Sequence, residues 1–118
     1  MGTKVLFHSD GNLNRILDGL VEAGIDALNP IEIQAGMSVG DIHRRYPRLL
    51  LVGGIDASHL LVFGSPDEIR GTMHRTMEAA EGRIMIGSTT ELHDAVPFEN
   101  FLALRDAVLN SGNYSGGL

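Results

Sequence analysis

The sequence predicts an α/β domain whose single parallel sheet is built from four strand–helix units. Four short apolar segments alternate with segments of helical character, which is the order that a parallel sheet with right-handed crossovers requires. Each apolar segment also runs into a polar cluster at its carboxyl end, and no comparable cluster precedes a segment. Because ligands of such sheets bind beyond the carboxyl ends of the strands, this asymmetry predicts a functional site on that rim.

The first unit is expected to be a strand over residues 5–7 and a helix that ends at Gly24. The strand is continuously apolar, as in a strand that is covered on both faces. Asn12 is the expected N-cap of the helix. The apolar positions of this helix recur at spacings of three and four residues, at Leu13, Ile16, Leu17, Leu20 and Val21.

The second unit begins with a strand over residues 25–28. Pro30 follows it and is not expected inside a central strand, because proline cannot donate a hydrogen bond to the ladder. Ser38 is the expected cap of a short helix over residues 39–46, which ends before Pro47.

The third and fourth strands are expected over residues 49–52 and 84–86. Between them, residues 57–63 form a connection with some helical character. A Ser-Pro pair at residues 65–66 supplies both the cap and the first residue of a strong helix. A last helix starts near Pro97, after the fourth strand.

Composition favours one soluble domain. A chain of 118 residues with 43% hydrophobic residues is ordinary for a single globular domain, which we expect to span residues 1–110, with residues 111–118 as a flexible Gly/Ser-rich tail. No apolar run reaches the ~20 residues of a membrane span. A net charge of −6 disfavours a nucleic-acid partner. The absence of cysteine excludes a thiolate metal site and is compatible with the cytoplasm, as is a start without a visible signal peptide.

His8 and Asp10 are the first candidates for a functional site. They lie two residues apart, so in an extended backbone their side chains face the same side of the sheet. One imidazole with one or two carboxylates can bind a divalent metal ion, or can act as acid and base in catalysis. The structural alternative is that Asp10 caps the next helix and His8 bonds a backbone carbonyl.

The other candidates follow the remaining strands. Asp56 is expected to be either a further catalytic group or an aspartate that closes a turn. Substrate contacts are expected from glycines, which let the backbone approach a ligand closely, and from polar side chains at the strand ends. A solvated loop position is the alternative for Glu32. These expected substrate contacts are Asn29, Glu32, Gly53, Gly54, Ser88 and Thr90.

Two other chemistries are disfavoured. Residues 87–90 offer amides and hydroxyls to an anion but lack the lysine of a Walker-type phosphate loop. Ser88 with His8 or His93 lacks the glycine spacing of a nucleophile elbow, which argues against a hydrolase. The remaining histidines are expected on solvated surfaces; they are His43, His59 and His74.

Five motifs occur in order along nearly the whole chain: residues 7–12 (Phe-His-Ser-Asp-Gly-Asn), 23–30 (Ala-Gly-Ile-Asp-Ala-Leu-Asn-Pro), 36–37 (Gly-Met), 53–56 (Gly-Gly-Ile-Asp) and 96–100 (Val-Pro-Phe-Glu-Asn). Together they resemble the uroporphyrinogen decarboxylase superfamily, which also contains zinc-dependent, cobamide-linked methyltransferases. The resemblance implies a (β/α)8 TIM barrel of which this chain is the C-terminal half, because such a barrel needs about 250 residues.

The resemblance also implies candidate functions. The superfamily includes decarboxylases that act on porphyrins, and residues 28–32 look nearer to the methyltransferase branch. In those methyltransferases a His-x-Cys pair and a later Cys bind zinc. Here His8 matches the histidine, whereas Asp10 and Thr90 stand at or near the cysteine positions. The resemblance therefore implies an oxygen-ligand variant, in which His8, Asp10 and Glu32 bind zinc or another divalent metal.

Half of a barrel leaves two strand edges and one apolar sheet face uncovered, which predicts a homodimer. Two hypotheses for function stay open. The chain is part of an enzyme for a small carboxylated or methylated substrate, incomplete for catalysis alone, or it is a non-catalytic half-barrel that folds as a homodimer. A third hypothesis, a flavodoxin-like binding domain, predicts helices on both faces of the sheet and a stable monomer.

Overall fold

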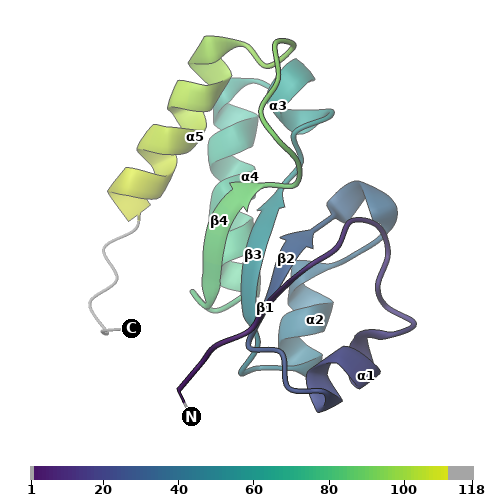
Figure 1. Cartoon of the computed structure of the whole chain (residues 1–118). Coiled ribbons are helices and arrows are strands. Elements are labelled where there is room, and N and C mark those ends of the chain that lie inside the picture. Colours follow the sequence, from purple (N-terminus) through teal and green to yellow (C-terminus); the bar gives the residue numbers. More distant parts are fainter. Residues whose placement is uncertain (1, 112–118) are drawn as a thin grey trace.

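The computed structural model describes residues 2–111 and contains one sheet of four parallel strands. The strands are β1 (Leu6–His8), β2 (Ala27–Ile31), β3 (Leu50–Ile55) and β4 (Ile84–Ser88). They lie side by side in the order in which they occur in the chain (Figure 1). A parallel sheet with this sequential order has the arrangement of half of a (β/α)8 barrel, which confirms the predicted fold class.

The helices cover one face of this sheet. They are α1 (Leu17–Glu22), α2 (Val39–Arg45), α3 (Leu60–Phe63), α4 (Pro66–Ala79) and α5 (Phe98–Ser111), with a short 3-10 helix, η1 (Ile33–Ala35). Helices α2 and α4 pack behind the sheet against β3, and α5 packs against α4 (Figure 1). Because helices lie on one face only within residues 2–111, the flavodoxin-like alternative is wrong. None of these helices is long and apolar enough to cross a membrane.

Side-chain caps explain where two of the helices begin. The hydroxyls of Ser38 and Ser65 each accept a hydrogen bond from the backbone N–H three residues further on, as predicted for α2 and α4. The predicted start of the first helix is wrong. Asn12 accepts from the N–H of Asn14 within a turn, and α1 begins only at Leu17.

Pro30 lies inside β2, which corrects the expectation that it stands outside a central strand. The register of the β2–β3 ladder shifts between Leu28 and Ile31. The residue that lacks an N–H therefore falls where regular pairing is already interrupted. The Asn29–Pro30 peptide bond is cis.

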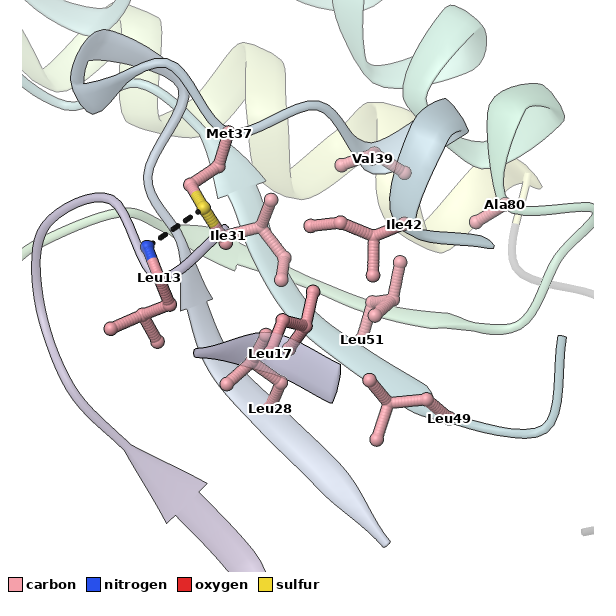
Figure 2. Packing of buried hydrophobic residues seen from close by; sticks show 10 residues of the cluster. All are labelled: Leu13, Leu17, Leu28, Ile31, Met37, Val39, Ile42, Leu49, Leu51 and Ala80. Atoms are coloured by element: carbon pink, nitrogen blue, oxygen red, sulfur yellow. Dashed lines mark hydrogen bonds between the residues drawn. The ribbon is translucent and has the colours of Figure 1, made fainter. Parts of the chain in front are cut away.

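Two clusters of buried apolar side chains hold the helices against the sheet. The first joins β2 and β3 to α1 and α2, and Figure 2 shows strand and helix side chains pointing towards one another. Its members are Leu13, Leu17, Leu28, Ile31, Met37, Val39, Ile42, Leu49, Leu51 and Ala80. The second joins the end of β3 to α3, α4 and α5, with members Ile55, Ala57, Leu61, Ile69, Met73, Ala103, Leu104 and Ala107.

The opposite face of the sheet is also largely apolar, and no helix within residues 2–111 covers it. Leu6 and Met85 are 58% and 59% exposed. Because side chains alternate along a strand, Leu6 shares its face with His8, and Ala27 shares the same face with Asn29. We call this surface the open face; it consists of Leu6, His8, Ala27, Asn29, Leu50, Val52 and Met85.

Two polar side chains of the helices, His43 and Asn100, are buried where no sequence pattern indicated it. His43 is buried, which corrects its predicted position at a solvated surface, and its Nε2 lies 2.9 Å from a carboxylate oxygen of Glu81. Asn100 donates from Nδ2 to two carbonyls at the end of α3, at 2.9 and 3.0 Å, and so holds α5 to that segment. His59 and His74 are exposed, as predicted.

Helix α5 runs through Ser111, the first residue of the predicted tail. The rest of that tail, residues 112–118, lies outside the described residues.

Candidate functional site

The carboxyl ends of β1 and β2 bring His8 and Asn29 together on the open face. The two residues are paired across the ladder, and Asn29 Nδ2 lies 3.0 Å from His8 Nδ1. The N–H of Ser9 donates to the Asn29 carbonyl at 3.0 Å and holds the strand ends in register. Because an amide nitrogen can only donate, this contact fits the tautomer of His8 that accepts at Nδ1 and leaves Nε2–H as a donor for a ligand.

Glu32 braces the loop that carries Asp10. Its carboxylate accepts a hydrogen bond from the N–H of Gly11, whose φ of +86° favours glycine. Asn12 donates from Nδ2 to the carbonyl of Ala35 at 3.0 Å, in the same pair of segments. The Asp10 side chain is exposed on this loop. The predicted residues Asp10 and Glu32 therefore lie at the same rim as His8, but Glu32 is already engaged with backbone.

Asp56 closes a turn at the end of β3. The side chain is 7% exposed, and its oxygens accept from the N–H groups of Ser58, His59 and Leu60 at 3.0, 2.9 and 3.0 Å. Burial by itself raises the pKa of this carboxyl, but the three backbone N–H groups and the nearby His59 hold the pKa below its usual value. The geometry matches the turn-closing alternative, and a catalytic role for Asp56 stays a prediction.

Gly53 and Gly54 lie in β3 with φ values of +111° and +87°, a region that favours glycine. A Cβ on Gly53 would lie 3.1 Å from the backbone nitrogen of Ile31, and one on Gly54 would lie 2.9 Å from Thr76 Cγ2. The positive φ values together with the close approach of β2 and α4 favour glycine at both positions without a ligand. Their predicted contact with a substrate stays a prediction.

The end of β4 carries a buried threonine that sequence reasoning missed. Thr89 is 5% exposed; its N–H donates to the Ile55 carbonyl at 2.8 Å, and its hydroxyl accepts from the Ala57 N–H at 3.4 Å. Its neighbours, the predicted contacts Ser88 and Thr90, are half-buried and exposed. A threonine within a run of polar residues carries no signal that separates it from them.

The predicted metal ligands do not converge. Within residues 2–111, no group of three or more His, Asp or Glu side chains lies close enough to hold one metal ion. His8 pairs with Asn29, Glu32 is bonded to Gly11, and Asp10 is exposed. The residues as arranged do not fit a zinc centre. The resemblance implies a divalent metal, whereas this arrangement does not favour one, and no chemical step is assigned to it.

Comparisons with known proteins agree with the geometry. Residues 1–110 match the family model described as uroporphyrinogen decarboxylase (URO-D). Among solved structures, the chain is similar to a methyltransferase from Methanosarcina mazei, with a TM-score of 0.72 and 24% sequence identity. The similarity covers 92% of this chain and 32% of the methyltransferase, so the chain spans about a third of that protein's length. A search of curated proteins found no match. Because the family model covers nearly the whole chain, the chain belongs to the uroporphyrinogen decarboxylase family.

Proposed function

We propose that this chain is the C-terminal half of a uroporphyrinogen decarboxylase-family enzyme, nearer to the methyltransferase branch, with a small-molecule site at the carboxyl ends of its strands. The observation that supports this most directly is the His8–Asn29 pair on the open face. In a closed barrel that face lines the interior, and barrel enzymes build their active sites at this end.

His8 is the residue that we expect to act on the ligand. The Asn29 amide orients the imidazole, so Nε2–H can donate a hydrogen bond to a carboxylate or carbonyl oxygen. In this proposal Asn29 is a positioning residue for the ring, and Glu32 is a positioning residue for the Asp10 loop. A small carboxylated substrate suits the donor that His8 presents.

Catalysis is expected to need more of the barrel than this chain supplies. A (β/α)8 barrel builds its site from eight loops, whereas the described residues contribute four strands. We therefore expect ligand binding without turnover from the chain alone. A cytoplasmic location and the absence of a nucleic-acid partner belong to the same proposal, supported by the net charge of −6 and the lack of cysteine.

Amide NMR spectroscopy of the chain during titration with succinate, a small dicarboxylate, tests the site. We expect shifts centred on residues 8–11 and 29–32, with a Kd of about 1 mM because half of the rim is missing. His8→Ala should abolish these shifts. His74→Ala should retain them, because His74 is exposed on α4 and not on the open face. Shifts centred elsewhere, or unchanged in His8→Ala, would contradict the proposed site.

A second candidate is a non-catalytic half-barrel that folds as a homodimer. The exposed apolar side chains of the open face favour it, together with the outer edges of β1 and β4, which have no partner strand within residues 2–111. The mass of the chain in solution tests this candidate and also begins the experiment below.

A further inference from the structure

The two edge strands, β1 and β4, share one charge pattern: a basic residue precedes each strand and an acidic residue follows it. Lys4 precedes β1 and Asp10 follows it, while Arg83 precedes β4 and Glu91 follows it. All four residues are exposed. Each outer edge of the sheet is therefore positive at its amino end and negative at its carboxyl end.

The amino end of the open face gathers positive charge. A hollow of about 390 Å³ lies there, with an apolar floor that includes Leu6 and Met85. Three cations, Lys4, Arg48 and Arg83, line it together with a single acid, Asp26. Lys4 Nζ lies 3.9 Å from the Asp26 carboxylate. The hollow thus has a net positive rim around an apolar surface, which favours an occupant that is both apolar and acidic.

We propose that a second copy of this chain covers the open face, with its strands running opposite to those of the first. The proposal rests on the self-association that the second candidate function requires, and adds its geometry. Two copies of the four-stranded sheet supply eight strands, enough to close a barrel whose interior is filled by side chains. A two-fold axis makes the interface self-complementary.

Charge selects between the two ways in which a two-fold axis can bring the open faces together. An axis along the strands places β1 beside β4 of the second copy, in parallel. We call the two places where the edge strands of the copies meet the seams. Across each seam, Lys4 then lies near Arg83 and Asp10 near Glu91. The cations of both hollows also gather at one end of the barrel. Like charges at each seam oppose this arrangement.

An axis perpendicular to the strands places β1 beside β1 and β4 beside β4, in antiparallel pairs. Lys4 and Asp10 are equally far along the chain from Phe7, the middle residue of β1, so pairing centred on Phe7 puts Lys4 opposite Asp10 of the second copy. Antiparallel pairing also brings Arg83 towards Glu91 of the second copy. Opposite charges then meet at both seams.

This geometry also completes each rim. The carboxyl end of one sheet meets the amino end of the other. The His8–Asn29 pair of one copy therefore lies at the same end of the barrel as Lys4, Arg48 and Arg83 of the other copy. A carboxylate bound by His8 would there meet positive charge that one copy alone does not place at that end. The second copy therefore contributes residues to the proposed site.

Sedimentation equilibrium at low salt, with Asp10→Lys compared with the wild type, tests the proposal. Asp10 is exposed and its side chain accepts no hydrogen bond within residues 2–111, so the substitution should leave the fold intact. In the antiparallel dimer the substitution sets a positive charge against Lys4 of the other copy at both symmetric positions, and we expect the dissociation constant to rise about tenfold. The double variant Lys4→Glu/Asp10→Lys reverses each pair and should restore association. Glu22→Lys, which makes the same charge change on α1, should have no effect.

Each result of this experiment has a distinct meaning. A monomer at every soluble concentration overturns both the self-association and its geometry. A dimer that is tightened by Asp10→Lys has the parallel arrangement, in which the introduced positive charge lies near Glu91, and overturns the geometry alone. A dimer that is insensitive to the substitution overturns it as well. Weakening by Asp10→Lys with recovery in the double variant supports the proposal.

Discussion

The two faces of the sheet carry similar side chains in different surroundings. Leu51, on the helix-covered face, is fully buried, whereas Leu6, on the open face, is 58% exposed. Each right-handed crossover returns its helix to the same side of the sheet, so one face is covered by helices and the other is not within residues 2–111. The comparison teaches that the type of side chain does not decide burial here. The direction of the crossovers does.

The carboxyl rim shows the same division among polar groups. Asp56 and Thr89, at the ends of β3 and β4, bond to backbone of neighbouring turns and are buried. His8 and Asn29, at the ends of β1 and β2, bond to each other on the open face. One part of the rim is therefore buried and bonded to backbone, and the other carries polar side chains on the open face.

The largest expected effect is a loss of stability when a leucine is truncated on the helix-covered face but not on the open face. Leu51→Ala should lower the free energy of unfolding by about 2–5 kcal/mol, because it leaves a cavity in the first cluster. Leu6→Ala should cost less than about 1 kcal/mol in the monomer, because its side chain is already largely in water. Urea unfolding at low protein concentration measures both. Equal losses would mean that the open face is covered in solution, and a dependence on protein concentration would assign the cover to self-association.

A smaller loss in the free energy of unfolding is expected from a substitution at Asp56. Asp56→Asn should cost about 1–3 kcal/mol at pH 7, because an amide nitrogen would then face backbone N–H groups that the carboxylate now satisfies. Since the pKa of Asp56 is lowered in the folded state, its charge stabilises the fold above the ordinary value of 3.8. That stabilisation is lost as the pH falls from this value through the folded pKa.

Urea unfolding between pH 7 and pH 2 measures the effect at Asp56, with Asp94→Asn as the control on an exposed position after β4. The control should stay within about 0.5 kcal/mol of the wild type. A difference between wild type and Asp56→Asn that does not shrink at acid pH would show that the carboxylate charge is not what holds the turn.

The smallest expected effect is the binding of zinc to the chain. Because His8, Asp10 and Glu32 do not converge with the geometry of a metal centre, isothermal titration with zinc should show no equimolar tight binding. Stoichiometric zinc that is lost in His8→Ala and kept in His74→Ala would contradict this expectation. It would also change the proposed role of His8 from hydrogen-bond donor to metal ligand.

Sequence reasoning predicted most of the fold and placed the candidate site residues at the carboxyl ends of the strands. The four strands, and the caps at Ser38 and Ser65, follow from local patterns that act over a few residues. It placed Asn29 and His8 on one rim but did not pair them. Their pairing depends on the register between β1 and β2, which is set by residues far apart in the chain.

Other features depended on packing between distant segments. His43 and Asn100 look like ordinary polar positions of a helix, and they are buried because Glu81 and the end of α3 lie against them. Pro30 was expected outside the sheet, yet it lies in β2 at a shift of register that only the contact with β3 reveals. That Asp56 accepts from three backbone N–H groups also became visible only once the turn after β3 was in place.

The sequence by itself determined the alternation of strands and helices, the carboxyl rim as the polar end, and membership of a superfamily of barrels. Hydrophobic periodicity and turn residues act locally, so a linear reading is enough for them. The tertiary structure alone decided which face the helices cover, which polar residues of the rim are buried, and that His8 lies beside Asn29. These depend on crossover direction and strand register, which are properties of segments meeting in space.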